Sequence, residues 1–482
     1  MTLTRPLFFM IVSLLFTSTI NAKIKLPAIV SSHMVLQRNT KVVVWGWADP
    51  NEEISISTSW LNKPLNTTTD SQGNWKLELQ TTNSKEPQTI KIVGDDSNIV
   101  LEDILFGEVW LCSGQSNMQQ PLNGYSGQPT FGALQAIATA NNPNLRLFTV
   151  ERLGSKAPLK NVEKYIKWQS ASPKNVSDFS AIAYFYGQQL QKILDVPVGM
   201  IHTSWGGSSV QAWISKEKIE KYEKVNLNDV DISKGTNHIP TALFNAMINP
   251  LIPYTIKGAL WYQGESNRSE PDKYKKLFPA MVQDWRDKWN LGDFPFYYVQ
   301  IAPYLYGNNE VFNTSENSAY IREIQLQCLD LIPNSGIAIT MDIGEAECIH
   351  PAKKKEVADR LLYNALNQTY GLLTVDFAGP TYKTHEIKND SVLLKFNNAE
   401  TGLYSYNGLT GFEIAGKDKV FYPAEAEIID RKYILVKNKN VTQPIAVRYG
   451  WKNWIEGTLY DTNLLPASSF RTDTWSDASK AN

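Results

Sequence analysis

The chain has 482 residues, of which 43% are hydrophobic, so it is long enough to bury more than one core, and its length favours about three domains. Its 47 Lys and Arg residues against 48 Asp and Glu residues give a formal net charge of -1. This balance argues against a nucleic-acid footprint and against an acidic tail. Three cysteines are too few for a disulfide framework; one bridge is possible and none is required.

The first 22 residues predict a secretory signal peptide. Arg5 precedes an apolar run from Leu7 to Phe16, and Ala22 offers a small residue at a plausible cleavage point. The run is too short to cross a membrane, no other stretch approaches about 18 apolar residues, and no Cys follows the cleavage point to carry a lipid. We therefore expect an exported protein, periplasmic or extracellular, without a membrane span.

Three compositional zones follow the signal. Residues 23–105 alternate short β-rich runs with turns, which predicts an N-terminal β-sandwich domain. Residues 106–371 alternate strands with helices, which predicts an α/β domain with a parallel sheet covered on both faces. Residues 372–482 return to the β pattern and predict a C-terminal β-rich domain.

The central zone contains strand-like runs and amphipathic helices in alternation. The apolar residues of the expected helices 181–194 and 353–369 recur on one face, which is typical of core packing rather than of cofactor contact. The expected strands are residues 108–112, 145–150, 198–203, 257–262, 296–301 and 336–341.

Ser116 follows the first of these strands. Ser113 and Gly114 are small residues that suit a sharp bend, so Ser116 would stand at the carboxyl end of the strand. In open α/β sheets ligands bind at that edge. Ser116 is therefore either a nucleophile or the N-cap of the next helix, since Ser is a favoured N-cap residue.

Three later strands also end in polar loops. The strand 198–203 leads to Gly206 and Gly207, whose paired glycines leave backbone N–H groups free to face a ligand. The strand 257–262 leads to Gln263, which is either a donor to a ligand or a turn-capping residue. Of the five histidines, only His350 lies just after an interior strand and just before a helix.

Together these loops supply what acyl transfer requires. Ser116 would attack an ester, and His350 would take its proton and pass it to the leaving alcohol. The Ser116 N–H, the Gly207 N–H and the Gln263 amide are candidate oxyanion donors, and each such donor lowers a barrier by roughly 3 kcal/mol.

The group that orients His350 has three candidates. Glu347 lies three residues before the histidine and is the first choice; Asp342, at the strand end, is the second, and a backbone carbonyl is the third. Asp342, Glu347 and His350 are also potential metal ligands. No second histidine or Cys pair lies at ligand spacing, so we expect no metal and no other cofactor.

Four motifs resemble the sialate O-acetylesterase family of SGNH hydrolases: G-Q-S-N-M at 114–118, S-W-G-G at 204–207, W-Y-Q-G-E-S-N at 261–267 and I-H-P at 349–351. Residues 34–38, 448–451 and 465–471 resemble the same family, so the likeness covers nearly all of the chain after the signal. It implies a flavodoxin-like three-layer domain, with Ser116 as nucleophile and His350 as base. It also implies an oxyanion hole formed by the Ser116 N–H, a glycine of the 206–207 pair and Gln263.

The resemblance implies a substrate class as well, namely acetyl esters on sugar hydroxyls and notably on sialic acids. Esterases acting on acetylated xylan, xyloglucan and pectin share the general pattern. A sialate carboxylate would need an arginine, for which Arg268 is one candidate, although it is equally a solvated surface residue. Glu347 departs from the family, which commonly has Asp three residues before the histidine.

Two other classes compete with this interpretation. An α/β-hydrolase carries G-x-S-x-G at its nucleophile, and here Met118 replaces the second glycine. A non-enzymatic carbohydrate-binding protein would hold sugar by aromatic stacking, but it would leave the coincidence of Ser116, Gln263 and His350 unexplained.

Overall fold

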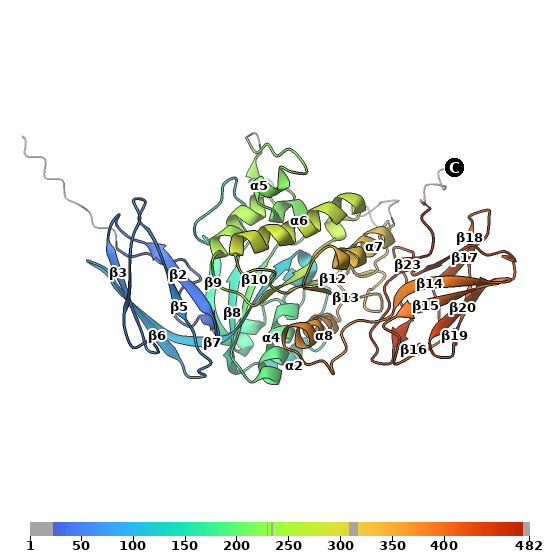
Figure 1. Cartoon of the computed structure of the whole chain (residues 1–482), viewed down its shortest axis with the longest axis horizontal. Helices are drawn as coiled ribbons and strands as arrows, with labels where there is room; N and C mark the ends of the chain where they lie inside the picture. Colours follow the sequence, from blue (N-terminus) through green and yellow to red (C-terminus); the bar gives the residue numbers. More distant parts are fainter. Residues whose placement is uncertain (1–22, 229, 233–234, 308–316, 476–482) are drawn as a thin grey trace, which may run out of the picture.

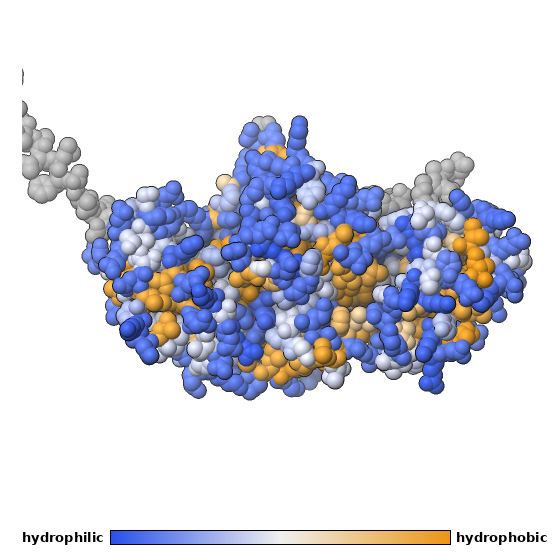
Figure 2. Space-filling view, in the orientation of Figure 1, coloured by the Kyte–Doolittle hydropathy of each residue, from blue (hydrophilic) through white to orange (hydrophobic). Residues whose placement is uncertain are grey.

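The computed structural model describes residues 23–228, 230–232, 235–307 and 317–475. The predicted signal peptide lies outside these residues. Figure 1 shows three parts that follow one another along the longest axis: an N-terminal β region, a central α/β region and a C-terminal β region. Figure 2 shows hydrophilic residues over most of one face, with hydrophobic residues in separate patches on all three parts.

The central region is built on a seven-strand arrangement with the order β13-β12-β11-β7-β10-β8-β9. Neighbouring strands are parallel except for β9, which pairs antiparallel with β8 at the edge. The sheet is therefore mixed, whereas the sequence predicted a parallel one. Its strands are β7 (Asn98–Gly114), β8 (Asn142–Val150), β9 (Tyr165–Ala171), β10 (Val198–Ser204), β11 (Gly258–Tyr262), β12 (Phe296–Val299) and β13 (Ser335–Ala338).

Helices cover both faces of this sheet (Figure 1). The residues of β7 alternate between two hydrophobic clusters, because successive side chains of a strand point to opposite faces. Val109 and Leu111 share a cluster with α6 (Pro271–Trp289) and α7 (Ala319–Gln327). Trp110 and Cys112 share the other cluster with α4 (Ala181–Leu194) and α8 (Lys354–Asn364). The remaining α-helices are short: α1 (Ser116–Gln119), α2 (Ala133–Ala138), α3 (Pro173–Val176) and α5 (Lys216–Ile219).

The predicted helix 181–194 has the bounds of α4. The predicted helix 353–369 is α8 followed by a π-helical turn at Ala365–Thr369. The six predicted central strands are all present, but β7 is 17 residues long, much longer than the predicted 108–112. It pairs with β6 (Gln88–Val93) near its start and with β10 and β11 near its end, so the predicted boundary at residue 105 falls inside one strand.

The N-terminal region consists of small antiparallel sheets. β2 (Lys41–Trp47) pairs with β5 (Asn74–Gln80), and β3 (Glu53–Thr58) pairs with β4 (Leu65–Thr68) and with β6. β1 (Val35–Gln37) runs parallel to β7.

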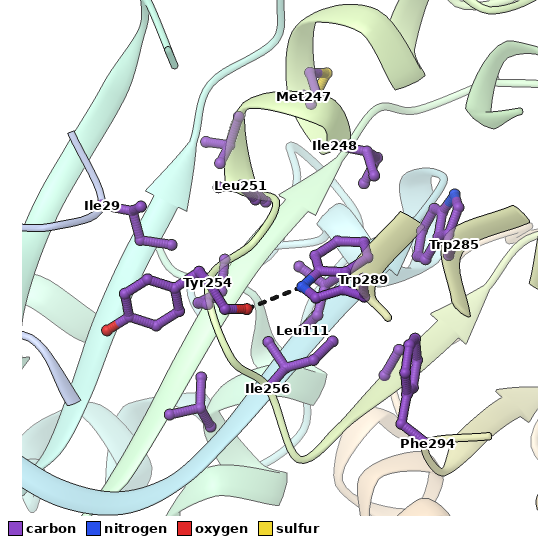
Figure 3. Packing of buried hydrophobic residues seen from close by; sticks show 14 of the residues in the cluster. Ile29, Leu111, Met247, Ile248, Leu251, Tyr254, Ile256, Trp285, Trp289 and Phe294 are labelled. Atoms are coloured by element: carbon purple, nitrogen blue, oxygen red, sulfur yellow. Dashed lines mark hydrogen bonds between the residues drawn. The ribbon is translucent and has the colours of Figure 1, made fainter. Parts of the chain in front are cut away.

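One hydrophobic core joins the N-terminal and central regions, and part of it appears in Figure 3. The Trp289 indole N–H donates to the Tyr254 carbonyl over 2.9 Å (Figure 3). The Tyr254 hydroxyl donates to the Val35 carbonyl over 2.7 Å. Since Val35 belongs to β1 and Trp289 to α6, Tyr254 connects the two regions.

The C-terminal region contains two four-stranded antiparallel sheets and one small strand pair. The first sheet has the order β14-β15-β20-β19, the second β18-β17-β21-β23, and β16 pairs with β22. The bounds are β14 (Thr381–Lys388), β15 (Ser391–Asn397), β16 (Leu403–Tyr404), β17 (Phe412–Ala415), β18 (Phe421–Pro423), β19 (Glu425–Ile429), β20 (Tyr433–Lys437), β21 (Ala446–Tyr449), β22 (Tyr460–Asp461) and β23 (Phe470–Arg471).

Arg322 of α7 attaches this region to the central sheet. Its guanidinium is fully buried and donates to the carbonyls of Gly450 (3.0 Å) and Lys452 (2.6 Å). It also donates to the hydroxyls of Ser469 (3.2 Å) and Ser318 (2.9 Å). Burial lowers the pKa of Arg322 to about 10, so the group stays charged at neutral pH and its hydrogen bonds are charge-assisted.

Arg322→Met leaves two buried carbonyls without their donor. We expect a loss of about 3 kcal/mol in the free energy of unfolding, because unpaired buried polar groups are costly. Urea unfolding followed by tryptophan fluorescence measures the change, with the exposed Arg152→Met as the control. Equal midpoints for the two variants would contradict the role given to Arg322.

Candidate active site

Ser116 is the first residue of α1, two residues beyond the end of β7. The N-cap is Gln115, in extended conformation, and no side chain caps the helix. Gly114 has a φ of 136°, and a Cβ at this position would lie 2.2 Å from the Tyr262 carbonyl oxygen, so only glycine fits the turn. The alternative that Ser116 merely caps a helix is wrong. Its half-buried hydroxyl has no hydrogen-bond partner in the part of the chain that the structure describes.

The glycine pair lies against this turn. A Cβ on Gly206 would be 3.2 Å from the Ser116 Cβ, which shows how closely the loop approaches. The Gly206 N–H already donates to Gln119 Oε1 over 2.7 Å. The N–H groups of Gly207 and Ser116 have no acceptor within the described ranges, so these two donors are available to a ligand.

Gln263 is fully buried at the end of β11, and its amide is already engaged. Nε2 donates to the Ser208 carbonyl over 3.0 Å and to Asn267 Oδ1 over 2.7 Å. Asn267 Oδ1 also accepts from the Val210 N–H over 2.9 Å, which fixes it as an acceptor and Gln263 Nε2 as the donor. In this arrangement Gln263 braces two loops, and the predicted donation to an oxyanion would require one of these two bonds to break.

His350 lies beside the nucleophile turn. Its ring packs edge-on against Tyr125, with centroids 5.3 Å apart, and the Tyr125 hydroxyl donates to the Ser116 carbonyl over 3.2 Å. The Asn117 amide donates to the Ile349 carbonyl over 3.1 Å, which ties the two loops together directly. No hydrogen bond joins the Ser116 hydroxyl to the His350 ring among the described residues. The structure thus brings the predicted nucleophile and base into one site.

The partner of His350 is Gln128, a residue that sequence reasoning missed. Nδ1 lies 2.6 Å from Gln128 Oε1, and since an amide oxygen accepts, Nδ1 carries the hydrogen and leaves Nε2 to receive a proton. Gln128 belongs to a loop that follows α1. No motif marks it, and a neutral amide is not the residue type sought behind a catalytic histidine.

None of the three predicted orienting groups contacts the His350 ring. Glu347 is exposed and has no hydrogen bond or ion pair with any residue that the structure describes. Asp342 faces the other way and forms two contacts with Arg360, of 2.8 and 2.7 Å. The predicted contact from Glu347 is therefore wrong, because its side chain points to solvent while Gln128 occupies Nδ1.

Burial lowers the pKa of His350 to about 4, and the nearby Lys354 ammonium acts in the same direction. A carboxylate partner would oppose this shift, whereas Gln128 is neutral. The imidazole is consequently unprotonated at neutral pH, the form that a general base requires.

Arg268 is half-buried rather than solvated. It donates to the Glu265 carbonyl over 3.1 Å, and its guanidinium lies over the Tyr306 ring at 4.7 Å from the centroid. Its role towards a substrate carboxylate stays a prediction.

Three further polar residues are buried behind Ser116. Asn117 donates to Glu265 Oε1 over 2.7 Å and accepts from Lys354 Nζ over 2.5 Å. Burial raises the pKa of Glu265 and lowers that of Lys354 to about 7. Asn117 and Glu265 stand within the motifs quoted above, but nothing in the sequence predicts that Lys354 joins them.

The model of the family described as "Carbohydrate esterase, sialic acid-specific acetylesterase" matches residues 107–354, more than half of the chain. The chain belongs to this family. As a member of the sialic acid-specific acetylesterases it is a carbohydrate esterase and hence a carboxylic ester hydrolase, so the non-enzymatic alternative is wrong.

Relatives of this acetylesterase family member extend over nearly its whole length. The crystal structure of XAC1771, a carbohydrate acetylesterase from Xanthomonas citri, is 34% identical, with a TM-score of 0.85 over 94% of this chain and 100% of that one. The sialate O-acetylesterase of Mus musculus is 26% identical over 92% of this chain and 93% of its own length. That of Homo sapiens is 26% identical over 88% of this chain and 87% of its own length. Within the described residues of the esterase, no helix is long and apolar enough to cross a membrane.

Gln128→Glu should change the pH dependence of the esterase. In the parent, kcat/KM for an aryl acetate should fall only as pH drops towards 4, where His350 becomes protonated. A carboxylate at Nδ1 stabilises the imidazolium and raises the pKa of His350, so the acidic limb should move to higher pH. The pH profiles of kcat/KM for the parent and for Gln128→Glu measure the two acidic limbs.

The same experiment has a matched control in Glu347→Gln, which should leave the profile and kcat unchanged because this side chain is exposed. A parent limb near 6.5, or a shift in Glu347→Gln instead of Gln128→Glu, would contradict the assignment of Gln128.

Proposed function

We propose that this esterase removes O-acetyl groups from carbohydrates, with sialic acids as the favoured substrates. The observation that carries the proposal is the meeting of Ser116 and His350 at one sheet edge, with the His350 ring held by Gln128 at 2.6 Å. The names of the full-length relatives, sialate O-acetylesterase and carbohydrate acetylesterase, support the acetyl ester as the reacting group.

In the first half of the reaction, the Ser116 hydroxyl attacks the acetyl carbonyl while His350 Nε2 takes its proton. The carbonyl oxygen becomes an oxyanion that accepts hydrogen bonds from the Ser116 and Gly207 N–H groups. Collapse of the tetrahedral intermediate breaks the bond to the sugar oxygen, and His350 returns the proton to this leaving group. The products are the free sugar hydroxyl and acetyl-Ser116.

In the second half, water attacks acetyl-Ser116 and gives a proton to His350 Nε2. The same two N–H groups stabilise the second oxyanion. Ser116 leaves, recovers the proton from His350, and acetate is released. Gln128 keeps the Nδ1–H in place throughout, although as a neutral amide it gives the imidazolium less stabilisation than a carboxylate would.

We further propose that the central region is an SGNH-type three-layer domain between two β domains, with boundaries near residues 105 and 371. The mostly parallel sheet with helices on both faces supports the proposed three-layer arrangement. The apolar run after Arg5 supports export to the periplasm or the outside of the cell.

A second candidate substrate class is the acetylated plant polysaccharides. The relative with 34% identity carries the broader name carbohydrate acetylesterase, whereas those named for sialate are 26% identical. The two classes differ in charge, because a sialic acid carries a carboxylate. Arg268 beside the Glu265 turn is the candidate partner for that carboxylate.

Ser116→Ala should abolish the release of acetate from an aryl acetate, with a loss in kcat of roughly 10⁴-fold or more because the nucleophile is missing. Acetate release and the trapped acetyl-enzyme, seen by mass spectrometry of the parent, measure the step. Ser126→Ala, at an exposed serine in the neighbouring loop, is the control and should keep full activity. A fully active Ser116→Ala would remove Ser116 from the mechanism.

Arg268→Met should lower kcat/KM for O-acetylated sialosides by about tenfold or more and leave that for an aryl acetate unchanged, because only the sialoside has a carboxylate to bind. The kcat/KM of the parent for these sialosides is compared with its kcat/KM for acetylated xylan and xyloglucan oligosaccharides. A preference of the parent for these neutral substrates would contradict the sialate assignment and leave the acyl-enzyme mechanism standing.

A further inference from the structure

A continuous chain of buried polar side chains lies directly behind the candidate nucleophile. Asn117 follows Ser116 in sequence and is 1% exposed; Glu265 is 4% exposed and Lys354 is 1% exposed. The amide of Asn117 stands between the two ionisable groups, 2.7 Å from Glu265 Oε1 and 2.5 Å from Lys354 Nζ. An amide is suited to this place because it donates from one end and accepts at the other.

The chain connects the segments that carry the reacting groups. Asn117 fixes α1, Glu265 belongs to the turn after β11, and Lys354 is the first residue of α8. The same Asn117 amide also donates to the Ile349 carbonyl over 3.1 Å, next to His350. Asn117, together with Tyr125, therefore helps to fix the nucleophile relative to the base.

The charges around the chain come from several elements. Lys354 faces Glu265, Glu345 and Cys348, while Glu265 faces Lys354 and Arg268 together with the hydroxyls of buried tyrosines. The buried tyrosines whose pKa values are raised in part by Glu265 are Tyr262, Tyr274 and Tyr306. His350 faces the Lys354 charge, the Tyr125 ring and the neutral Gln128. Lys354 is thus the charged group that acts on the imidazole.

We propose that Lys354 is a positioning residue for the ester hydrolysis: through Asn117 it fixes Ser116 beside the segment that carries His350, and its ammonium repels a second positive charge on the imidazole. The proposal rests on the assignment of Ser116 and His350 as nucleophile and base. Its two parts are separable, because the hydrogen bond to Asn117 requires only a donor and the effect on His350 requires a charge.

The effect of the Lys354 charge on His350 agrees with the order in which the two groups lose their protons as pH rises. The pKa of Lys354, lowered to about 7 by burial, still lies above that of His350. Lys354 is therefore charged throughout the pH range in which His350 takes up a proton. Because like charges repel, this uptake is delayed to lower pH.

Removing the charge and the donor together gives the first test. Lys354→Met should lower kcat for an aryl acetate by about 10-fold to 100-fold, because Ser116 and His350 are no longer held in position relative to each other. KM should change by less than about threefold, because the surface that binds the substrate remains. It should also move the acidic limb of kcat/KM upward by about half to one pH unit. Steady-state kinetics between about pH 3.5 and 8 measure both effects, because this approximate range includes the pKa values of His350 and Lys354.

Removing only the charge gives the second test. Lys354→Gln retains an N–H donor for Asn117, so its kcat should exceed that of Lys354→Met, while its acidic limb should move upward equally. Glu265→Gln removes a negative charge instead of a positive one, so it should not move the acidic limb of kcat/KM to higher pH. Lys355→Met, at the exposed lysine one position along α8 that pairs with Asp359, is the matched control and should behave as the parent.

An unmoved acidic limb in both Lys354 variants overturns the proposal, even if kcat falls, since a merely structural role predicts that result. Unchanged kcat in Lys354→Met overturns it as well. If Lys354→Met fails to fold, as judged by near-ultraviolet circular dichroism, Lys354→Gln decides the electrostatic part alone. Failure of the underlying assignment is recognised separately, because Ser116→Ala would then retain activity.

Discussion

The structure depends on the continuous strand β7. Its first half completes a sheet of the N-terminal region by pairing with β6, and its second half is central in the α/β sheet between β10 and β11. The strand ends at Gly114, which must approach the Tyr262 carbonyl so closely that no side chain fits. The turn after β7 is therefore held by the neighbouring strand, and Ser116 begins a helix at a fixed place on the sheet edge. Rigidity at this point comes from a shared core, in which Tyr254 contacts both regions.

The site around Ser116 is half-buried and mostly neutral around the His350 ring. Burial and the Lys354 charge both disfavour the imidazolium, and Gln128 orients the ring without a negative charge. If His350 acts as the proposed base, this arrangement keeps it unprotonated over a wide pH range but stabilises its protonated form less than an Asp or Glu would. The buried Glu265 carboxyl is joined to Lys354 by the Asn117 side chain. The buried ionisable pair of the esterase is thus linked through Asn117 to the residue after Ser116, whereas the His350 ring contacts a neutral amide.

The sequence predicted those features that depend on local patterns. Apolar periodicity identified α4 and the central strands, and reading the residues after each strand located Ser116, Gly207 and His350 at one edge. It did not predict β9, since the first residues of this edge strand are exposed and lack a buried pattern. It chose Glu347 over Gln128 because sequence proximity favours a residue three positions from His350. Which side chain reaches Nδ1 is instead decided by the path of a loop more than two hundred residues away in sequence.

The C-terminal region contacts the start of the segment that leads to His350. The Gly457 N–H donates to the Met341 carbonyl over 2.9 Å, and the Tyr304 N–H donates to the Asn453 carbonyl over 2.9 Å. Met341 follows β13 and begins the segment that ends at His350, so its position is set by contacts from both regions. Arg322 holds the same junction with four hydrogen bonds from one buried guanidinium. Because the proposed base stands on a loop and not on a strand, its geometry requires support from outside the sheet. The buried junction provides this support, because it fixes Met341 and α7 against the C-terminal β region.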